Sequence, residues 1–185
     1  HHKAPVYHQF QMRMIEAESF NGVDIHQEDA NQLARHINVD LTYLDPPYNS
    51  RQYSRFYHVY ENLVQWKKPK LYGTALKPKE EKMSDYCRNA AFNVFTDLVS
   101  RVQSRYLLVS YNNTYHSIRS SSENKIKLEQ LEEVLNKCGR TQVFNHAFKA
   151  FNSGKTEFED HREYLFITEV DDERRNLSFP DVLRG

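Results

Sequence analysis

Two consecutive prolines, Pro46 and Pro47, constrain the fold of this chain more than any other feature of its sequence. They follow the apolar run at residues 39–44 and the carboxylate of Asp45. Proline lacks a backbone N–H, fixes φ at about −65° and disfavours helix in the preceding residue. The run at 39–44 is therefore predicted to be a strand that stops here, and Asp45-Pro46-Pro47-Tyr48 to be a stiff, exposed loop.

Hydrophobic periodicity predicts that strands and helices alternate along the chain from residue 22 onward. The predicted strands cover residues 23–26, 39–44, 106–110, 141–151 and 163–170. The predicted helices are a short one at residues 30–36, one at 55–67, one starting at Ser84, and one from Ser120 to Gly139. Such alternation predicts an α/β sheet with helical crossovers, in which ligands bind at the carboxyl ends of the strands. The last two strands are expected to pair as an antiparallel ribbon.

Capping residues and apolar faces support the predicted helices. Ser54 is the expected N-cap of the helix at residues 55–67. Ser120 and Glu123 form an expected capping box, and Gly139 is the expected stop of that helix. The helix at 55–67 has an apolar face, and most of its aromatic side chains are expected to pack in the core. The apolar face consists of Phe56, Val59, Tyr60, Leu63 and Val64, and the aromatic set adds Tyr53 and Tyr57.

The composition fits one globular domain, because 39% of the 185 residues are hydrophobic. The 25 basic and 25 acidic residues cancel, so contact with nucleic acid requires a local basic surface. The lysine-rich stretch at residues 67–82 offers such a surface. It is either a solvated face or a set of phosphate contacts, which would add salt dependence without sequence readout.

Two further observations disfavour whole classes of protein. These residues contain no run of about 18 apolar residues and no charged and apolar leader, which predicts a cytoplasmic protein without a membrane partner. Cys87 and Cys138 are the only thiols and form no CxxC pair, so neither a disulfide framework nor a metal site is expected.

The proline loop has the chemistry that is needed to hold an aromatic amine. The lone pair of an exocyclic amine is delocalised into its ring, so a methylating enzyme must favour the sp³-like transition state with hydrogen-bond acceptors. Asp45 supplies a carboxylate, and Pro46 supplies a backbone carbonyl whose direction Pro47 restricts. Tyr48 supplies an aromatic face for a flipped base, worth roughly 1–3 kcal/mol. The alternative interpretation is a strand-terminating turn, in which proline and Asp are common.

The residues around this loop resemble a known family. Residues 43–58, Tyr-Leu-Asp-Pro-Pro-Tyr-Asn-Ser-Arg-Gln-Tyr-Ser-Arg-Phe-Tyr-His, resemble the Dam-like (alpha-class) adenine-N6 DNA methyltransferases of bacterial restriction–modification systems. The resemblance extends over residues 22–170. It implies a Rossmann-like class I S-adenosylmethionine-dependent methyltransferase fold, α/β, with the central strands incomplete in this chain. It also implies that Asp45, Pro46, Pro47 and Tyr48 form the catalytic loop.

The resemblance further implies a cofactor and its contacts. S-adenosylmethionine would be bound by Asp29, Ala30 and Asp45, with Asp29 near the adenine of the cofactor. Asp29 can equally be the N-cap of the helix that starts at Ala30, and the two roles are compatible. The expected DNA contacts are Asn49, Ser50, Arg51, Tyr53, Asn112 and Asn113. The pair Asn112 and Asn113 also fits simple turn chemistry.

The chain departs from the family pattern in one respect. Family members have a Phe-x-Gly-x-Gly loop for the methionine part of the cofactor, and these 185 residues contain no Gly-x-Gly. The loop is expected on a preceding segment outside this sequence or on a partner chain, unless the chain is a shortened one. Residues 1–21 are interpreted as a linker or the end of a target-recognition region, 22–170 as the C-terminal half of the catalytic domain, and 171–185 as a tail.

These features together predict a site-specific DNA adenine-N6 methyltransferase of a restriction–modification system. It would transfer a methyl group from S-adenosylmethionine to a flipped adenine in double-stranded DNA, beside a cognate restriction endonuclease. One alternative is a non-catalytic DNA-binding subunit or decayed paralogue, which the missing glycine loop favours. Another is methylation of RNA or of protein glutamine, which is disfavoured because those families more often have Asn in place of Asp45.

Overall fold

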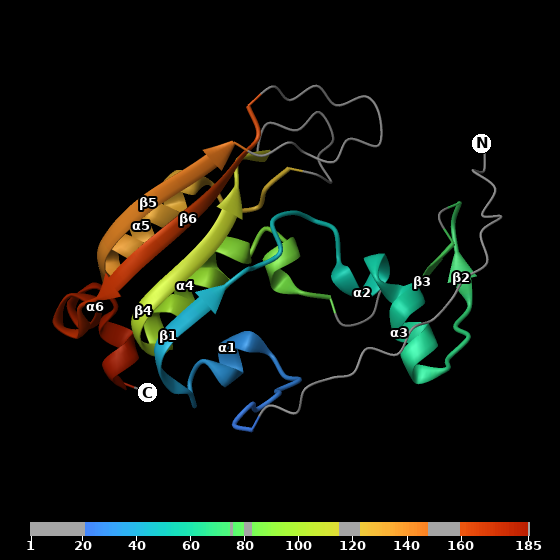
Figure 1. The fold of residues 1–185 in the computed structure, drawn as a ribbon, viewed down its shortest axis with the longest axis horizontal. Coiled ribbons are helices and arrows are strands. Elements are labelled where there is room, and N and C mark those ends of the chain that lie inside the picture. Colours follow the sequence, from blue (N-terminus) through green and yellow to red (C-terminus); the bar gives the residue numbers. More distant parts are fainter. Residues whose placement is uncertain (1–20, 75, 80–82, 115–122, 148–159, 185) are drawn as a thin grey trace.

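The computed structural model describes residues 21–74, 76–79, 83–114, 123–147 and 160–184 (Figure 1). The strands are β1 (Asn38–Leu44), β2 (Leu71–Tyr72), β3 (Lys77–Pro78), β4 (Gln103–Asn112), β5 (Gly139–Ala147) and β6 (Arg162–Val170). The α-helices are α1 (Ala30–Leu33), α2 (Tyr53–Phe56), α3 (His58–Gln65), α4 (Ala91–Arg101), α5 (Leu128–Cys138) and α6 (Asp172–Ser178). The 3₁₀ turns among the described residues are η1 (Asp85–Cys87) and η4 (Pro180–Arg184).

Four strands form the main sheet, in the order β1-β4-β6-β5. β1 and β4 run parallel, with Leu44 opposite Val109, whereas β6 is antiparallel to both β4 and β5. A parallel pair needs a crossover connection, and α4 lies within it. The predicted α/β sheet with a helical crossover and the predicted ribbon of β5 and β6 are therefore confirmed. Because β1 and β4 are parallel, Asp45 and Asn113 follow their strands at the same edge of the sheet.

Helices α4 and α5 cover one face of this sheet and form the core with it (Figure 1). The side chains of β4 alternate, so that Leu107, Val109 and Tyr111 are fully buried beneath the helices. The helices contribute their own buried side chains, Ala91, Phe95, Leu98 and Val99 from α4 and Leu131, Val134, Leu135 and Cys138 from α5. The apolar spacing of the two helices thus predicted their buried faces. The apolar run at residues 106–110 was predicted as a buried strand, and the structure confirms the strand but buries only its alternate side chains.

Gly139 joins α5 to β5 where two backbones come close together. A Cβ added there would lie 2.0 Å from the carbonyl oxygen of Glu169 on β6. Glycine is the only residue without a Cβ, so it is required at this close approach. The predicted end of the helix is confirmed, and the sheet pairing explains the residue.

The N-terminal elements differ from the prediction. Residues 23–26 form no strand, and the side chain of Ile25 is 90% exposed. β1 is the edge strand of the described sheet, and residues 23–26 do not pair with it. The helix predicted at 30–36 is confirmed in type but ends at Leu33, because residues 34–36 form turns.

Several predicted helix starts were wrong. Ser54 lies inside α2, whose N-cap is Gln52, and the helix breaks at Tyr57 before α3. Ser84 caps the 3₁₀ turn η1 by accepting from the Tyr86 N–H, and α4 begins only at Ala91. α5 begins at Leu128, after Glu123, and Ser120 lies outside the described residues. In each case the local hydrogen bonds differ from those that the capping signals suggested.

The segment interpreted as a tail, residues 171–185, contains the helix α6 and the 3₁₀ turn η4 within its described part. Asp171 caps α6, and Arg175 of this helix is buried against the end of α4. The Arg175 guanidinium donates to the Val102 carbonyl over 2.7 Å and to the Asp172 carboxylate over 2.7 Å. The hydrogen bond to Val102 thus fastens α6 to the core, and Asp172 of the same helix balances the buried charge of Arg175.

The predicted core face of the helix at 55–67 is exposed. α2, α3, β2 and β3, together residues 51–79 and here called the arm, extend away from the main sheet in Figure 1. Phe56 is 50% exposed and Val64 is 87% exposed. Periodicity identified an apolar face correctly but could not show that the main sheet leaves this face uncovered. Within the described residues, no helix is long and apolar enough to cross a membrane.

Candidate active site

The side chains of the proline loop form a hydrogen-bonded chain with two strands. Oδ1 of Asp45 accepts from the Tyr48 hydroxyl at 2.9 Å and from Oγ of Ser110 at 3.1 Å. The Tyr43 hydroxyl in turn donates to Oγ of Ser110 at 2.9 Å. Asp45 is therefore oriented by Ser110 of the neighbouring strand as well as by its own loop. The sequence offered no signal for Tyr43 or Ser110, because the parallel pairing of β1 and β4 brings them together.

The backbone of the loop is held from the core side. Pro46 is buried, and the Tyr48 carbonyl accepts from the Lys125 N–H at 2.8 Å and from the Tyr111 hydroxyl at 3.1 Å. The rings of Tyr48 and Tyr111 meet edge to face, with their centroids 5.0 Å apart. Tyr111 is fully buried, so the loop rests on a rigid part of the core.

Burial and charge raise the pKa of two groups near the loop, Tyr48 and Glu163. Burial raises the pKa of Tyr48, and its hydrogen bond to Asp45 raises it further. The Tyr48 hydroxyl therefore stays protonated and can only donate to the carboxylate. Burial and the charge of Asp45 also raise the pKa of Glu163, at the start of β6. Glu163 is thus a second carboxyl group close to Asp45, which sequence analysis did not identify.

A cavity of about 1320 Å³ brings together the two segments that were predicted to bind a cofactor. Asp29 and Ala30 line it together with Asp45, Pro46 and Pro47. Ligand pockets usually measure about 300–1,000 Å³, so this cavity has room for a small molecule and more. Tyr48 does not line it. Within the described residues, no cluster of His, Cys, Asp or Glu could hold a metal ion.

Asp29 acts as a helix cap at the edge of this cavity. Its Oδ1 accepts from the backbone N–H groups of Asn31 at 3.0 Å and Gln32 at 3.1 Å. The N-cap interpretation of Asp29 is therefore confirmed. Because the residue also lines the cavity, the cap does not exclude its predicted role in cofactor binding, and Ala30 follows it as the first residue of α1.

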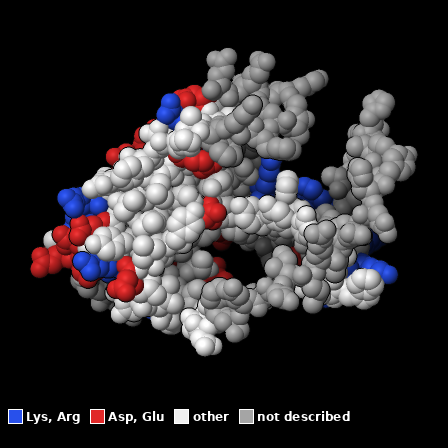
Figure 2. All heavy atoms as spheres, in the orientation of Figure 1, with Lys and Arg blue, Asp and Glu red and all other residues white. Residues whose placement is uncertain are grey.

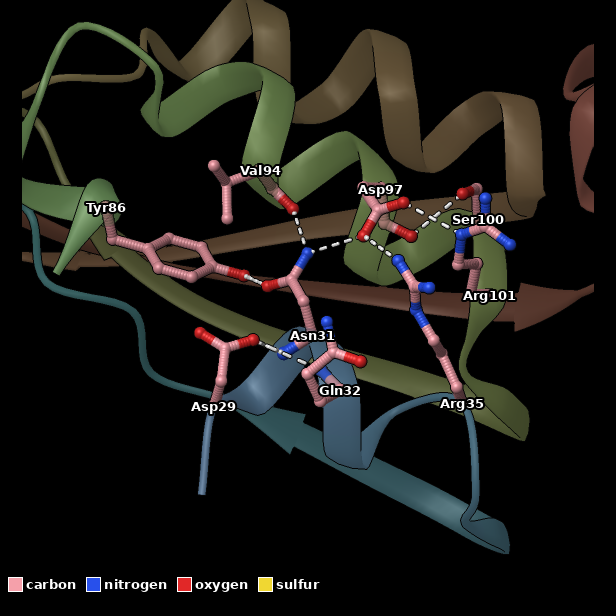
Figure 3. A network of polar contacts seen from close by, with 9 residues as sticks. All are labelled: Asp29, Asn31, Gln32, Arg35, Tyr86, Val94, Asp97, Ser100 and Arg101. Carbon is pink, nitrogen blue, oxygen red and sulfur yellow. Dashed lines mark hydrogen bonds and ion pairs between the residues drawn. The ribbon is translucent and has the colours of Figure 1, made fainter. Parts of the chain in front are cut away.

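A network around Asn31 fastens α1 to α4 (Figure 3). Asn31 donates to the Val94 carbonyl and to the Asp97 carboxylate, both at 2.8 Å, and accepts from the Tyr86 hydroxyl at 2.8 Å. Arg101 donates to the other oxygen of Asp97 at 2.8 Å. Burial raises the pKa of Asp97, but hydrogen bonds from Asn31 and Arg101 outweigh it and hold that pKa below its usual value.

This network positions Asp29, because the residue immediately before α1 moves with that helix. Asn31 is 8% exposed, and both atoms of its side-chain amide have partners. Burial raises the pKa of Tyr86, so its hydroxyl stays a donor to Asn31. Sequence analysis missed Asn31, Tyr86 and Asp97, since residues that are far apart along the chain meet only in the fold.

The predicted DNA contacts after the loop lie at the base of the arm. Oδ1 of Asn49 accepts from the Arg51 N–H at 3.0 Å, and Asn49 also forms a β-bridge with Asn124. Arg51 lies over the Phe56 ring, 5.9 Å from its centroid. Tyr53 is 52% exposed, and its partial burial raises the pKa of its hydroxyl. Ser50 is half-buried between Asn49 and Arg51.

Asn112 and Asn113 hold loops together at the end of β4. Asn112 accepts from the Thr114 hydroxyl at 2.7 Å and from Nδ2 of Asn124. Asn113 is 9% exposed, donates to the Asp160 carbonyl and accepts from the Arg162 N–H. The turn chemistry considered for this pair is therefore present. Contact of either residue with DNA stays a prediction.

Buried Gln52 is a further structural residue that the sequence did not reveal. Its side-chain amide donates to the Ser84 carbonyl at 3.1 Å and accepts from the Ser84 N–H at 2.7 Å. The Cys87 thiol donates to the Arg51 carbonyl at 3.5 Å. These contacts fasten the start of the arm to the segment that lines the cavity.

A mixed α/β sheet with Asp-Pro-Pro-Tyr at the carboxyl end of a strand defines the class to which this site belongs. Residues 5–105 match the family model described as D12 class N6 adenine-specific DNA methyltransferase. The chain belongs to this family, which implies a class I S-adenosylmethionine-dependent methyltransferase fold. The resemblance that the sequence suggested is thus confirmed.

Individual relatives point the same way. The chain is 33% identical over 152 residues to the type II methyltransferase M.FokI of Planomicrobium okeanokoites, covering 79% of this chain and 22% of that protein. It is 32% identical over 156 residues to the type II methyltransferase M.NlaIII of Neisseria lactamica, covering 80% of this chain and 43% of that protein. The chain therefore spans less than half the length of these relatives. No solved structure matches it significantly.

Proposed function

We propose that this chain carries the catalytic loop of a site-specific DNA adenine-N6 methyltransferase. The observation that carries the proposal is the place of Asp45, which follows β1 directly and lines the same cavity as Asp29. Membership of an N6 adenine-specific DNA methyltransferase family supports it. Ligands of open α/β sheets bind at the carboxyl ends of strands, which is where Asp45 lies.

The acceptors for the adenine amino group would be Asp45 and the backbone carbonyl of Pro46. Tyr48 and Ser110 both donate to Oδ1 of Asp45. The other carboxylate oxygen, Oδ2, would then accept from the adenine amino group. Two acceptors that face one NH₂ group favour the pyramidal nitrogen of the transition state over the planar ground state. In-line transfer would form the N6–carbon bond as the methyl–sulfur bond breaks, with S-adenosylhomocysteine as the leaving group and the surplus N6 proton released to water. No protein nucleophile would be needed.

Tyr48 would stack on the flipped adenine. Its backbone carbonyl is fixed by Lys125 and Tyr111, so the ring extends from a rigid support. A supported ring loses little entropy when a base stacks on it, and such stacking is worth roughly 1–3 kcal/mol per base. This stabilisation would offset part of the cost of removing the adenine from the duplex.

S-adenosylmethionine would supply the activated methyl group, and Asp29 fits its adenosine end. A carboxylate at the cavity edge can accept hydrogen bonds from ribose hydroxyls or an adenine amine. The described lining of the cavity includes no glycine, so it holds no glycine-rich loop for the methionine end. A preceding segment or a partner chain would provide that loop and the further central strands.

The relatives suggest the setting of the reaction. M.FokI and M.NlaIII are type II methyltransferases, which supports double-stranded DNA as the substrate and a restriction–modification system with a cognate endonuclease. The family description also speaks against RNA or protein glutamine as the substrate. A non-catalytic DNA-binding subunit would keep the loop without transferring a methyl group.

The test replaces Asp45 in the full-length protein and measures transfer of labelled methyl groups from S-adenosylmethionine to adenine N6 in duplex DNA. We expect Asp45→Ala to lower kcat at least about 100-fold, since losing one group that stabilises a transition state typically costs 10²–10³. Asp40→Ala is the matched control, because Asp40 is an exposed carboxylate on the same strand. Full methylation by Asp45→Ala would overturn the proposal, and an inactive wild-type protein that still binds DNA would establish the non-catalytic alternative.

A further inference from the structure

The arm carries a positive charge that the chain as a whole lacks. Residues 51–79 contain five lysines and two arginines but only one acidic residue, Glu61, whereas the complete chain has 25 basic and 25 acidic residues. The lysines of the arm are Lys67, Lys68, Lys70, Lys77 and Lys79. The zero net charge of the chain thus combines a strongly basic arm with an excess of acidic residues elsewhere.

These lysines are available to an external anion. Lys67, Lys68, Lys70 and Lys79 are exposed, and no carboxylate of the described residues forms an ion pair with them. Figure 2 shows blue atoms without red over the outer end of the arm, whereas red and blue mix over the opposite end of the molecule. A basic surface without internal counter-ions attracts a polyanion most strongly.

Exposed aromatic rings alternate with the cations. Lys68 lies over the Trp66 ring at 5.6 Å from its centroid, and Lys70 lies over the Tyr72 ring at 5.6 Å. Trp66 is 76% exposed and Tyr72 is 48% exposed. These rings belong to a set of exposed apolar side chains on the arm that includes Leu63 and Leu71, and large exposed apolar patches commonly mark interaction sites. Rings and cations side by side suit a nucleic acid, since the cations contact phosphates and the rings contact bases or sugars.

The arm lies close to the proposed catalytic loop. α2 begins at Tyr53, only five residues after Tyr48. Five residues span at most about 17 Å, a length that corresponds to about five phosphates along one DNA strand. Backbone phosphates next to a base held by Tyr48 would therefore come within reach of the start of the arm at Tyr53. A duplex that continues along the arm would meet its lysines farther from that base.

We infer that the arm is a second DNA-binding surface of this protein, in which Lys67, Lys68 and Lys70 bind the phosphate backbone of the duplex at a distance from the target adenine and Trp66 contacts a nucleotide between these phosphates. This inference rests on the proposed function, which makes DNA the substrate. The surface lies farther along the chain than the predicted DNA contacts that follow the proline loop. It contributes binding affinity and positions the DNA, but it does not read the base sequence.

The competing occupant is a protein. Val59, Leu63 and Leu71 line a shallow hollow of about 320 Å³ next to Trp66, which an apolar side chain could fill. The lysines decide between the two partners, because Lys67 and Lys68 line the same hollow. Charged residues, lysine above all, are depleted at the centre of protein interfaces, whereas phosphate contacts require them.

The experiment measures the affinity of the full-length protein for a fluorescent duplex that contains its target site, over a range of salt concentrations. The arm variant is Lys67→Ala/Lys68→Ala/Lys70→Ala. The control is Lys127→Ala/Lys137→Ala/Arg140→Ala, which removes the same charge from exposed positions around α5. We expect the slope of log affinity against log salt to fall by about 0.9 for each phosphate that the protein no longer neutralises, up to about 2.7 for the arm variant. The control should keep the wild-type slope.

A substitution at Trp66 separates stacking from charge. Trp66→Ala should weaken DNA binding about 5- to 150-fold, the range that corresponds to losing one stacked base, without changing the salt slope. Trp66→Tyr should restore most of the affinity. If the arm variant and the control have equal slopes and Trp66→Ala binds like wild type, the arm is not a DNA-binding surface and a protein partner is favoured. Methyl transfer by the wild-type protein tests the proposed function separately, since DNA binding is read here without turnover.

Discussion

The Tyr48 hydroxyl donates a hydrogen bond to Oδ1 of Asp45 over 2.9 Å, so two side chains that the proposed reaction needs contact each other directly. Ser110 donates to the same oxygen from β4. The carboxylate is thereby held in one orientation before any substrate arrives. Such preorganisation lowers the cost of aligning an acceptor with the amine during the reaction.

This contact leads to a prediction for Tyr48. Tyr48→Phe removes the hydroxyl but keeps the ring, and Ser110 still donates to the same oxygen of Asp45, so we expect kcat to stay within about tenfold of wild type. Tyr48→Ala removes the stacking face and should lower kcat/KM by about 5- to 150-fold. Steady-state methylation kinetics on duplex DNA measure both. Equal activity of Tyr48→Ala and Tyr48→Phe would contradict a stacking role.

The bond between Asn31 and Tyr86 makes a prediction about cofactor binding. Tyr86→Phe removes the donor to Oδ1 of Asn31, which loosens α1 and therefore the position of Asp29. We expect the Kd for S-adenosylmethionine to rise about 3- to 15-fold, the equivalent of one hydrogen bond, while the Kd for DNA stays the same. Isothermal titration with each ligand makes the comparison.

The control for this prediction is the adjacent ion pair. Arg101→Gln removes a partner of Asp97 on the far side of the network from Asp29. It should lower the melting temperature without a selective loss of cofactor affinity. If Tyr86→Phe and Arg101→Gln weaken the binding of both ligands equally, the network contributes only to general stability.

Gly139 is predicted to tolerate no side chain. Gly139→Ala would place a Cβ 2.0 Å from the Glu169 carbonyl oxygen and force β5 away from β6. Overpacking of this kind costs on the order of 1–3 kcal/mol or more in the free energy of unfolding. Urea denaturation measures the loss, with Gln142→Ala on an exposed part of β5 as the comparison. A variant as stable as that control would show that the two strands can separate without cost.

Cys138 is predicted to be inert to thiol reagents in the folded protein. Burial raises the pKa of its thiol to about 12, although the charges of Arg175 and Arg174 lower it. The fold therefore favours the neutral thiol. Its contribution to stability is fully present below the pKa of about 9 in the unfolded chain and is lost as pH rises towards 12.

The measurement is alkylation of the two cysteines at pH 8 and pH 9.5, with and without denaturant. Both thiols are buried and free, and burial also raises the pKa of Cys87. We expect little labelling of Cys138 in the native protein at either pH and complete labelling in urea. Rapid native labelling of Cys138 at pH 8 would be inconsistent with its place between α5 and α4.

Sequence periodicity was a good guide wherever an element packs on one face only. The apolar spacing in α4 and α5 predicted the side chains that these helices bury in the core, because a helix buries the residues that recur with its own period. In the arm, periodicity predicted a core face that is exposed, because apolar spacing is the same whether or not another element covers the face. It shows that a face is apolar but cannot show what covers it, and the side chain of Val64 is in fact exposed.

The predicted site residues were recovered only in part. Asp29 and Asp45 line one cavity as predicted from the resemblance. Their supports, Ser110 for Asp45 and Asn31 with Tyr86 for Asp29, had no signal in the sequence. A short polar side chain looks the same in a sequence whether it is solvated or buried in a network, and burial depends on contacts between distant segments.

The amino-acid sequence by itself determined that a strand stops at Pro46 and that Asp45 follows its end, because the geometry of proline leaves the backbone no alternative. The tertiary structure decided what surrounds that carboxylate. Parallel pairing of β1 with β4 brings Ser110 to Asp45, and packing of α1 on α4 brings Asp29 to the same cavity. Local backbone geometry acts within a few residues, whereas a site is formed by contacts between segments that only the complete fold brings together.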